Sequence, residues 1–145
     1  MALSETTLRK GFVEELKRRE QLEVTRIEDT LSSGLPDICV SGVHMWIETK
    51  VAKNGRVKSK GIQRLTLRRL GRVSASYMLI WDEEHKLTTL VPSSGIPLKG
   101  PIGVVDIARK DSTWTEVSGF PCHQQVVDFL LDQHRATICD CCDRL

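Results

Sequence analysis

The stretch GLPDICVSGVHMWIETK, residues 34–50, decides the fold of this chain. It contains two short apolar runs, and the pair Ser41-Gly42 between them is a turn signal. Runs that are rich in β-branched or aromatic residues and bounded by Gly, Pro and Ser are typical of strands. A turn of two small residues between such runs favours a hairpin. The stretch therefore predicts two antiparallel strands.

The predicted hairpin brings three charged side chains together. Side chains alternate between the two faces of a strand, so Glu48 and Lys50 project side by side. If the two strands pair, Asp37 at the start of the first lies across from the end of the second. Two adjacent carboxylates repel each other, and Mg²⁺ relieves this because it takes one or two carboxylates plus water and phosphate oxygens. The cluster indicates a metal site that acts on phosphate. The alternative is a plain hairpin with a surface Glu-Lys pair.

These residues resemble the motif of the PD-(D/E)XK nuclease superfamily, in Pro36-Asp37 followed by Glu48-Thr49-Lys50. The Gly34 before the Pro and a Gln on the next helix are similar to the virus-type replication-repair nuclease (VRR-Nuc) branch and to small phage nucleases akin to junction resolvases. The likeness covers about residues 1–92. It implies an α/β fold with a restriction-endonuclease-like core, in which helices flank a central mixed β-sheet.

The resemblance also implies a role for each matching residue. Asp37 and Glu48 would hold Mg²⁺ or Mn²⁺, and the Thr49 carbonyl would be a further ligand. Lys50 would be the catalytic lysine, and Gln63 would be an accessory catalytic residue.

A helix is predicted to begin after Ser4, which is a good N-cap residue. Three apolar residues form one stripe at helical spacing, namely Leu8, Phe12 and Leu16. Glu5 lies on the same stripe, and an acid on an inward face needs a partner or a metal. The resembled branch places a Glu of its first helix in the active site, and we carry this role to Glu5, with Glu15 as the alternative. The other interpretation is that Glu5 interacts with the helix dipole.

The net charge is only +2, but residues 51–72 carry Lys and Arg and no acid. A basic segment beside a candidate metal site suits a phosphate backbone, although a solvated charged face would have the same composition. Asn54-Gly55 predicts a turn. A helix is expected from about residue 60 to 70, with Gln63 facing inward and two arginines facing outward. The predicted DNA contacts are Lys53, Arg56, Lys58, Lys60, Arg64 and Arg68.

The remaining segments predict alternating strands and helices, which supports an α/β layer fold. The expected elements are a first strand at 23–30, a buried central strand at 76–81, an exposed turn at 82–85, a strand at 87–91, an irregular loop at 92–103, an edge strand at 104–107 and a helix from Pro121 to about Arg135. By the resemblance Glu28 lies at the rim of the site, and the alternative is a surface residue of the strand.

Cysteines and histidines gather toward the end of the chain, which raises the question of a zinc site. They are Cys122, His123, His134, Cys139, Cys141 and Cys142. The usual Cys-x-x-Cys spacing is absent, and adjacent cysteines are awkward ligands for one ion. Free reduced thiols are therefore the preferred interpretation, and a regulatory zinc site is the minor alternative.

Length and composition predict a single domain over residues 1–145, with a nuclease core at about 1–92 and an extension at 93–145. There is no apolar run of transmembrane length and no signal-peptide pattern, so we expect a cytoplasmic protein without membrane contact. The expected function is a Mg²⁺- or Mn²⁺-dependent DNA endonuclease, selective for branched or flapped DNA and active as a homodimer. The alternatives are a DNA-binding module without catalysis and a restriction-type, sequence-specific nuclease.

Overall fold

The computed structural model describes residues 3–19, 22–27, 35–41, 44–100, 102–103 and 115–134. The elements are α1 (Glu5–Lys17), β1 (Val24–Arg26), β2 (Ile38–Val40), β3 (Met45–Val51), β4 (Arg56–Val57), α2 (Gly61–Leu70), β5 (Ala75–Asp82), β6 (Leu87–Pro92), the 3₁₀ turn η2 (Ser93–Gly95), β7 (Ile102–Gly103), β8 (Thr115–Ser118) and α4 (His123–His134).

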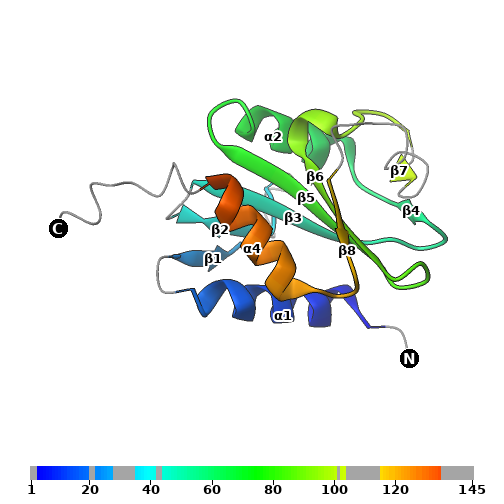
Figure 1. Cartoon of the computed structure of the whole chain (residues 1–145). Coiled ribbons are helices and arrows are strands. Elements are labelled where there is room, and N and C mark those ends of the chain that lie inside the picture. The colour runs from blue at the N-terminus through cyan, green and yellow to red at the C-terminus, as the bar shows by residue number, and fades with distance from the viewer. Residues whose placement is uncertain are drawn as a thin grey trace.

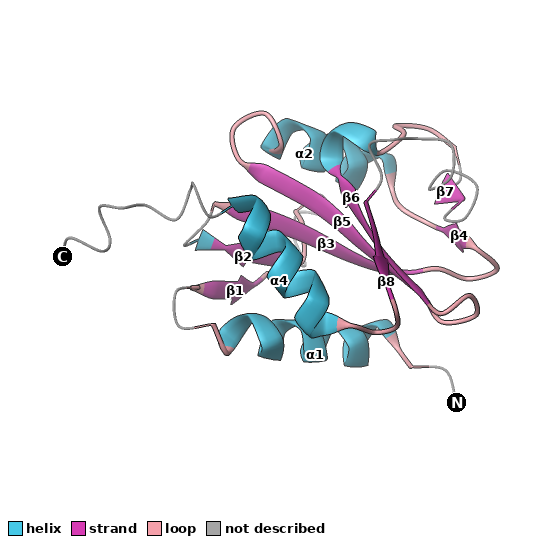
Figure 2. Ribbon diagram, in the orientation of Figure 1, coloured by secondary structure: helices cyan, strands magenta, loops and turns pink. Residues whose placement is uncertain are grey.

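The main sheet has the strand order β1-β2-β3-β5-β6-β8. Strands β3 and β5 are parallel, and the other neighbours are antiparallel, so the sheet is mixed. Helices α1 and α4 lie on one side of this sheet and α2 lies on the other (Figures 1 and 2). A short ribbon of β4 and β7 stands beside it. The predicted α/β fold with a central mixed sheet and flanking helices is confirmed.

Helix α1 begins where the sequence predicts, because the Ser4 hydroxyl accepts a hydrogen bond from the Thr7 backbone N–H at 3.1 Å. Its apolar stripe is buried against the sheet, as expected for an amphipathic helix. The stripe and its partners form one core cluster that includes Leu8, Phe12, Leu16, Ile47, Leu79 and Trp81. Each large side chain buried there contributes about 1.5–3 kcal/mol of transfer free energy. This packing fixes α1 beside strand β3.

Helix α4 completes the same layer and begins at His123, two residues after the predicted start. The His123 ring packs edge-on against Trp81, with 5.9 Å between ring centroids, and lies over Gly11 of α1. A Cβ on Gly11 would come within 2.8 Å of His123 Nε2, so glycine is what permits this close approach. Strand β8 pairs with β6. The segment after residue 92 thus contributes both an edge strand and a covering helix.

The prediction that Arg64 and Arg68 face outward is wrong. Arg64 is only 5 % exposed, whereas the apolar Ile62 is 53 % exposed. Arg64 Nη1 donates hydrogen bonds to the carbonyls of Pro97 and Gly100, at 3.0 and 2.7 Å. Arg68 Nη2 donates likewise to the Ile96 carbonyl, at 2.7 Å. These guanidinium groups lie against the loop after β6, because they donate hydrogen bonds to loop carbonyls that lie outside the β-ladders.

The prediction of an exposed turn at 82–85 is wrong for its first residue. Asp82 ends strand β5 and is buried. Its carboxylate accepts hydrogen bonds from the His85 backbone N–H and pairs with His85 Nδ1. The loop at 92–103 is also more regular than expected, since it contains η2 and β7.

Several predictions fall outside the described residues. They concern Glu28, the edge strand at 104–107, and the tail from Arg135 onward with Cys139, Cys141 and Cys142. Within the described ranges, no helix combines the length and the apolar composition needed to cross a bilayer.

Candidate functional site

The hairpin of β2 and β3 places Asp37 beside Glu48. Ile38 pairs with Ile47 in the antiparallel register. The residue before Ile38, Asp37, and the residue after Ile47, Glu48, therefore lie opposite each other at the open end of the hairpin. Both the backbone N–H and the hydroxyl of Thr49 donate to Asp37 Oδ2, each at 2.9 Å. These two bonds fix the Asp37 carboxylate in one orientation, as the sequence-based hairpin requires.

Glu48 is the buried centre of the cluster, with 2 % of its surface exposed. Its Oε1 lies 3.6 Å from Lys50 Nζ, while its Oε2 is buried and receives no hydrogen bond from the described residues. Burial raises the Glu48 pKa from 4.5 to about 8. The negative charge of Asp37 and a hydrogen bond to the Asp37 side chain add to the rise, while Lys50 opposes it. The Glu48 carboxyl is therefore mostly protonated at neutral pH when no cation is bound.

The first turn of α1 closes the cluster with Glu5 and Arg9. Burial raises the Glu5 pKa, Lys50 and Arg9 lower it, and Asp37 raises it. Arg9 Nη1 lies 3.2 Å from Asp37 Oδ1 and 4.0 Å from Glu5 Oε1. Arg9 was not predicted to belong to the site, although its position one helical turn after Glu5 was a usable signal.

The structure separates the two acids of α1 that the sequence left open. The Glu15 carboxylate lies 3.3 Å from Arg18 Nη1 and 3.2 Å from Arg19 Nη2, on another part of the helix. Glu5, by contrast, interacts electrostatically with Asp37, Lys50 and Arg9. Of the two, Glu5 is the acid that adjoins the candidate site.

The donor set fits a hard divalent cation that takes few protein ligands. Asp37 and Glu48 are adjacent carboxyl groups, and no donor of the described residues bonds to Glu48 Oε2. Mg²⁺ commonly binds one or two carboxylates and completes its octahedron with water and phosphate oxygens. Within the described residues, no group of three or more His, Cys, Asp and Glu side chains forms a fuller ligand set.

Gln63 lies in the first turn of α2 and is half-buried. Its side chain makes no hydrogen bond to any residue of the described ranges. The structure therefore records no contact that joins Gln63 to the carboxylates. Its predicted accessory role remains a prediction.

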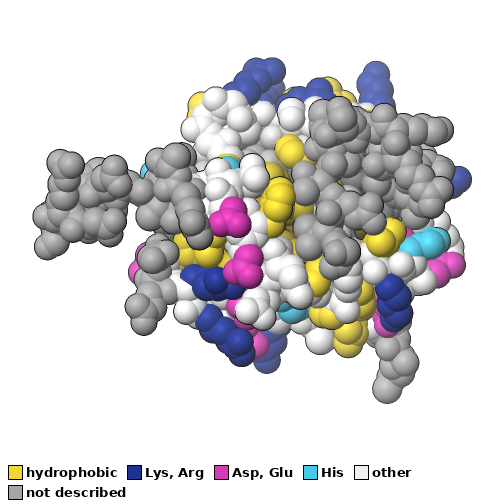
Figure 3. Space-filling model, in the orientation of Figure 1, with side chains coloured by type: hydrophobic (Ala, Val, Ile, Leu, Met, Phe, Trp, Pro, Cys, Tyr) yellow, Lys and Arg dark blue, Asp and Glu magenta, His cyan; other side chains and the backbone are white. Residues whose placement is uncertain are grey.

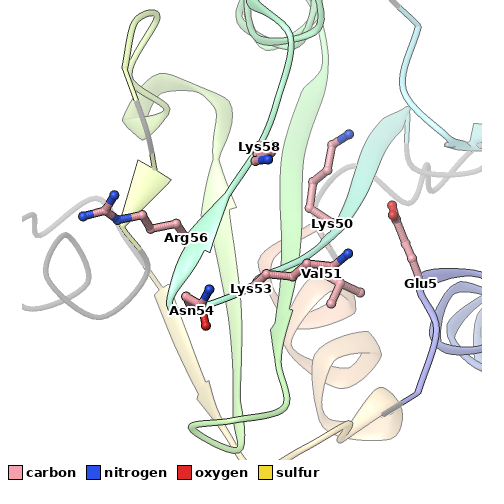
Figure 4. A pocket seen from close by; sticks show the side chains of 7 residues that line it. All are labelled: Glu5, Lys50, Val51, Lys53, Asn54, Arg56 and Lys58. Atoms are coloured by element: carbon pink, nitrogen blue, oxygen red, sulfur yellow. The ribbon is translucent and has the colours of Figure 1, made fainter.

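A cleft of about 680 Å³ opens beside the cluster. Figure 4 shows Glu5 projecting from α1 and Lys50 from β3 at this cleft, with the β3–β4 turn along the other side. Asn54 and Gly55 both have positive φ, 54° and 70°, which is the geometry of a tight Asn-Gly turn. The cleft is lined by Glu5, Lys50, Val51, Lys53, Asn54, Arg56 and Lys58.

Three of the six predicted DNA contacts thus line one basic cleft next to Lys50, namely Lys53, Arg56 and Lys58. Lys60 is exposed just before α2 but is not part of the lining. Arg64 and Arg68 are held by the loop carbonyls described above. The basic segment therefore divides into a cleft-lining part and a part used inside the fold.

The described members of the Cys/His cluster have separate surroundings. His134 Nε2 hydrogen-bonds with the Tyr77 hydroxyl at 2.7 Å, and Cys122 Sγ donates to the Gly119 carbonyl at 3.4 Å. Burial lowers the pKa values of His123 and His134. Among the residues that the structure places, these three side chains form no metal-binding group.

No sequence model of a known protein family and no curated protein matches the chain. The function of the chain must therefore be inferred from its own residues. The buried Glu48, the partly exposed Asp37 and Lys50 form a cluster at the edge of a basic cleft.

Proposed function

We propose that this protein is a metal-dependent nuclease that hydrolyses phosphodiester bonds of DNA. The observation that carries the proposal is the buried Glu48 carboxyl, whose Oε2 receives no hydrogen bond from the described residues while Asp37 and Lys50 adjoin it. A buried and unsatisfied acid is costly for folding alone. Strongly perturbed carboxyls in a cleft are candidates for catalytic or metal-binding groups.

Each residue of the cluster has a role in this reaction. A bound Mg²⁺ or Mn²⁺ would supply Lewis acidity and neutralise charge on the scissile phosphate. Asp37 and Glu48 would hold it, and Thr49 keeps Asp37 in position through its two hydrogen bonds. Lys50 Nζ would orient the attacking water and stabilise the charge that develops on the phosphate oxygens. Glu5 would add negative charge at the edge of the metal site.

The adjacent cleft supports nucleic acid as the substrate. Lys50, Lys53, Arg56 and Lys58 outnumber the single acid Glu5 in its lining. Cations along a cleft contact the sugar-phosphate backbone without reading sequence. The narrower assignment, to the PD-(D/E)XK superfamily with a preference for branched or flapped DNA, depends on the motif resemblance. Cutting both strands would require two such sites, which a homodimer would provide.

A cleavage assay tests the proposal. Labelled four-way junction, flap, linear duplex and single-stranded DNA are incubated with Mg²⁺, Mn²⁺ or EDTA. We expect cutting only with metal, and loss of cutting in Glu48→Ala and Lys50→Ala. The matched controls are Glu84→Ala and Lys99→Ala, which make the same changes at exposed positions outside the cluster. Cleavage that persists in Glu48→Ala would contradict the proposed role of this residue.

A second candidate function is a DNA-binding module without catalysis. It is favoured by the contacts of Arg9 with Asp37 and of Lys50 with Glu48, which balance the acids without a metal ion. The two functions differ in their response to metal. A nuclease site predicts that Mg²⁺ or Mn²⁺ raises the melting temperature of the wild type and not of Glu48→Ala. An unchanged melting temperature, together with DNA binding that EDTA does not alter, would favour the binding module.

A further inference from the structure

A second basic hollow, of about 240 Å³, lies between α1 and β1. We call it the α1 hollow. An α-helix repeats every 3.6 residues, so one broad face of α1 carries Arg9, Lys10, Val13, Glu14 and Lys17. The α1 hollow is lined by Arg9, Lys10, Val13, Glu14, Lys17 and Arg26. Four of these six residues are cations and one is an acid.

Arg9 connects the α1 hollow to the candidate site. Its guanidinium Nη1 lies 3.2 Å from Asp37 Oδ1, so the same side chain lines the hollow and contacts the acidic cluster. Glu5, one helical turn earlier, lines the cleft with Lys50. The first turns of α1 therefore separate two basic depressions, and the acidic cluster lies between them.

Two cations of the α1 hollow, Lys10 and Lys17, are available to an anion. Both are exposed, and neither has an ion-pair partner among the described residues.

The face that carries α4 is different. There, Lys and Arg side chains lie beside Asp and Glu side chains (Figure 3). Arg19, for example, contacts Asp128 at 2.7 Å. Lys10 and Lys17 of the α1 hollow have no such contact with an acid among the described residues.

We propose that the α1 hollow binds the phosphate backbone of the nucleic-acid substrate on the side of the candidate site opposite to the cleft. Lys10 and Lys17 are separated by about 10 Å along the helix axis. That span matches about three phosphates at the 3.4 Å rise of one DNA strand. A backbone held in both depressions continues on both sides of the scissile phosphate. The consequence is cutting within a strand rather than at its end, so the inference deepens the proposed nuclease function and rests on it.

The test measures binding of a labelled DNA duplex in EDTA, where no cleavage occurs, over a series of salt concentrations. Lys10→Ala/Lys17→Ala is compared with Arg72→Ala/Lys99→Ala, which removes two exposed cations outside both depressions. We expect the first variant to bind about tenfold more weakly at low salt. Its slope of log affinity against log salt should fall by about two, because each phosphate contact contributes about 0.9. The control should match the wild type.

A change of opposite sign makes the test sharper. Glu14 is the one acid of the α1 hollow and its side chain has no partner in the described chain. Glu14→Gln should tighten duplex binding by about twofold to threefold, since it removes a repulsion of phosphate. Glu84→Gln adds the same net charge at an exposed turn and should leave the affinity unchanged. Circular dichroism verifies that each variant is folded.

The outcomes separate this inference from the proposed function. If the wild type neither binds nor cuts DNA, both are overturned. If it binds and cuts, but Lys10→Ala/Lys17→Ala behaves like its control, only the α1 hollow is overturned. Weaker binding to phosphatidylserine vesicles with unchanged binding to DNA would also overturn it, in favour of a membrane surface.

Discussion

Two buried acids on neighbouring strands have opposite surroundings. Glu48 on β3 is 2 % exposed and Asp82 on β5 is 1 % exposed. Both Asp82 oxygens are bonded, Oδ1 to the His85 backbone N–H at 3.2 Å and Oδ2 to His85 Nδ1 at 2.8 Å. Glu48 has one oxygen near Lys50 and one that receives no hydrogen bond from the described residues. A satisfied buried acid stabilises a turn, whereas an unsatisfied one is a candidate for a functional group.

The largest effect expected from this comparison is on catalysis. Glu48→Gln keeps the shape of the side chain but removes the charge that a cation needs. We expect single-turnover cleavage to fall by at least about 10³-fold, equivalent to about 4 kcal/mol of transition-state stabilisation. Asp82→Asn, the same chemical change at the satisfied acid, should stay within a few fold of wild type. Equal losses in the two variants would remove the distinction between the acids.

The second prediction is that Glu48 makes the metal-free protein less stable as pH rises. Its pKa is about 8 in the folded protein against an ordinary 4.5. Between these values the folded state holds a proton that the unfolded state has released. The free energy of unfolding therefore falls with rising pH, by at most about 1.4 kcal/mol per unit. Glu48→Gln should lack this fall and exceed wild type by on the order of 2 kcal/mol at pH 8.

Urea unfolding in EDTA at several pH values between 5 and 9 measures this difference. Its interpretation is simple because His123 and His134, whose pKa values are lowered, destabilise the fold on the acid side in both proteins and cancel. A difference between wild type and Glu48→Gln that does not vary with pH would show that the Glu48 carboxyl ionises normally.

The third prediction concerns Asp82. Asp82→Asn keeps one oxygen for the His85 backbone N–H but replaces the carboxylate oxygen at His85 Nδ1 by an amide, so the buried contact of a carboxylate with the ring is lost. We expect a loss of about 1–3 kcal/mol in the free energy of unfolding. Chemical denaturation at pH 7 measures it, with Asp132→Asn on α4 as an exposed comparison for the same substitution. An unchanged stability would mean that the His85 contacts contribute nothing net.

The sequence was sufficient to predict the centre of the candidate site. Alternation along β3 puts Glu48 and Lys50 on one face, and the hairpin register puts Asp37 beside Glu48. Both follow from local geometry that a strand and its turn determine. Glu5 could not be chosen over Glu15 in the same way. That choice depends on Arg18, Arg19 and the distant Asp37, which only the packing of α1 brings into place.

The sequence misled where a long-range contact decides which face is buried. The apolar residues of α2 suggested that the side of the helix with Gln63 faces inward and that Arg64 faces outward. The helix instead buries Arg64, because loop carbonyls far along the chain accept its hydrogen bonds. Asp82 was assigned to a turn because it is charged, although β5, whose residues are all buried from Met78 onward, continues through it. In both cases a charged side chain is buried with its partners, and hydrophobic patterning does not reveal partners.

The smallest effects come from comparing two arginines of the same basic segment. Arg56 is exposed in the cleft, and Arg64 is buried against Pro97 and Gly100. Arg56→Ala should change the free energy of unfolding by less than about 0.5 kcal/mol, and lower the salt slope of DNA binding by about one. Arg64→Ala should do the reverse, with about 1–2 kcal/mol of lost stability and an unchanged slope. Denaturation and salt-dependent anisotropy on both variants measure the two quantities. A reduced slope in a folded Arg64→Ala would return this residue to the DNA interface and would mean that the loop releases its guanidinium on binding.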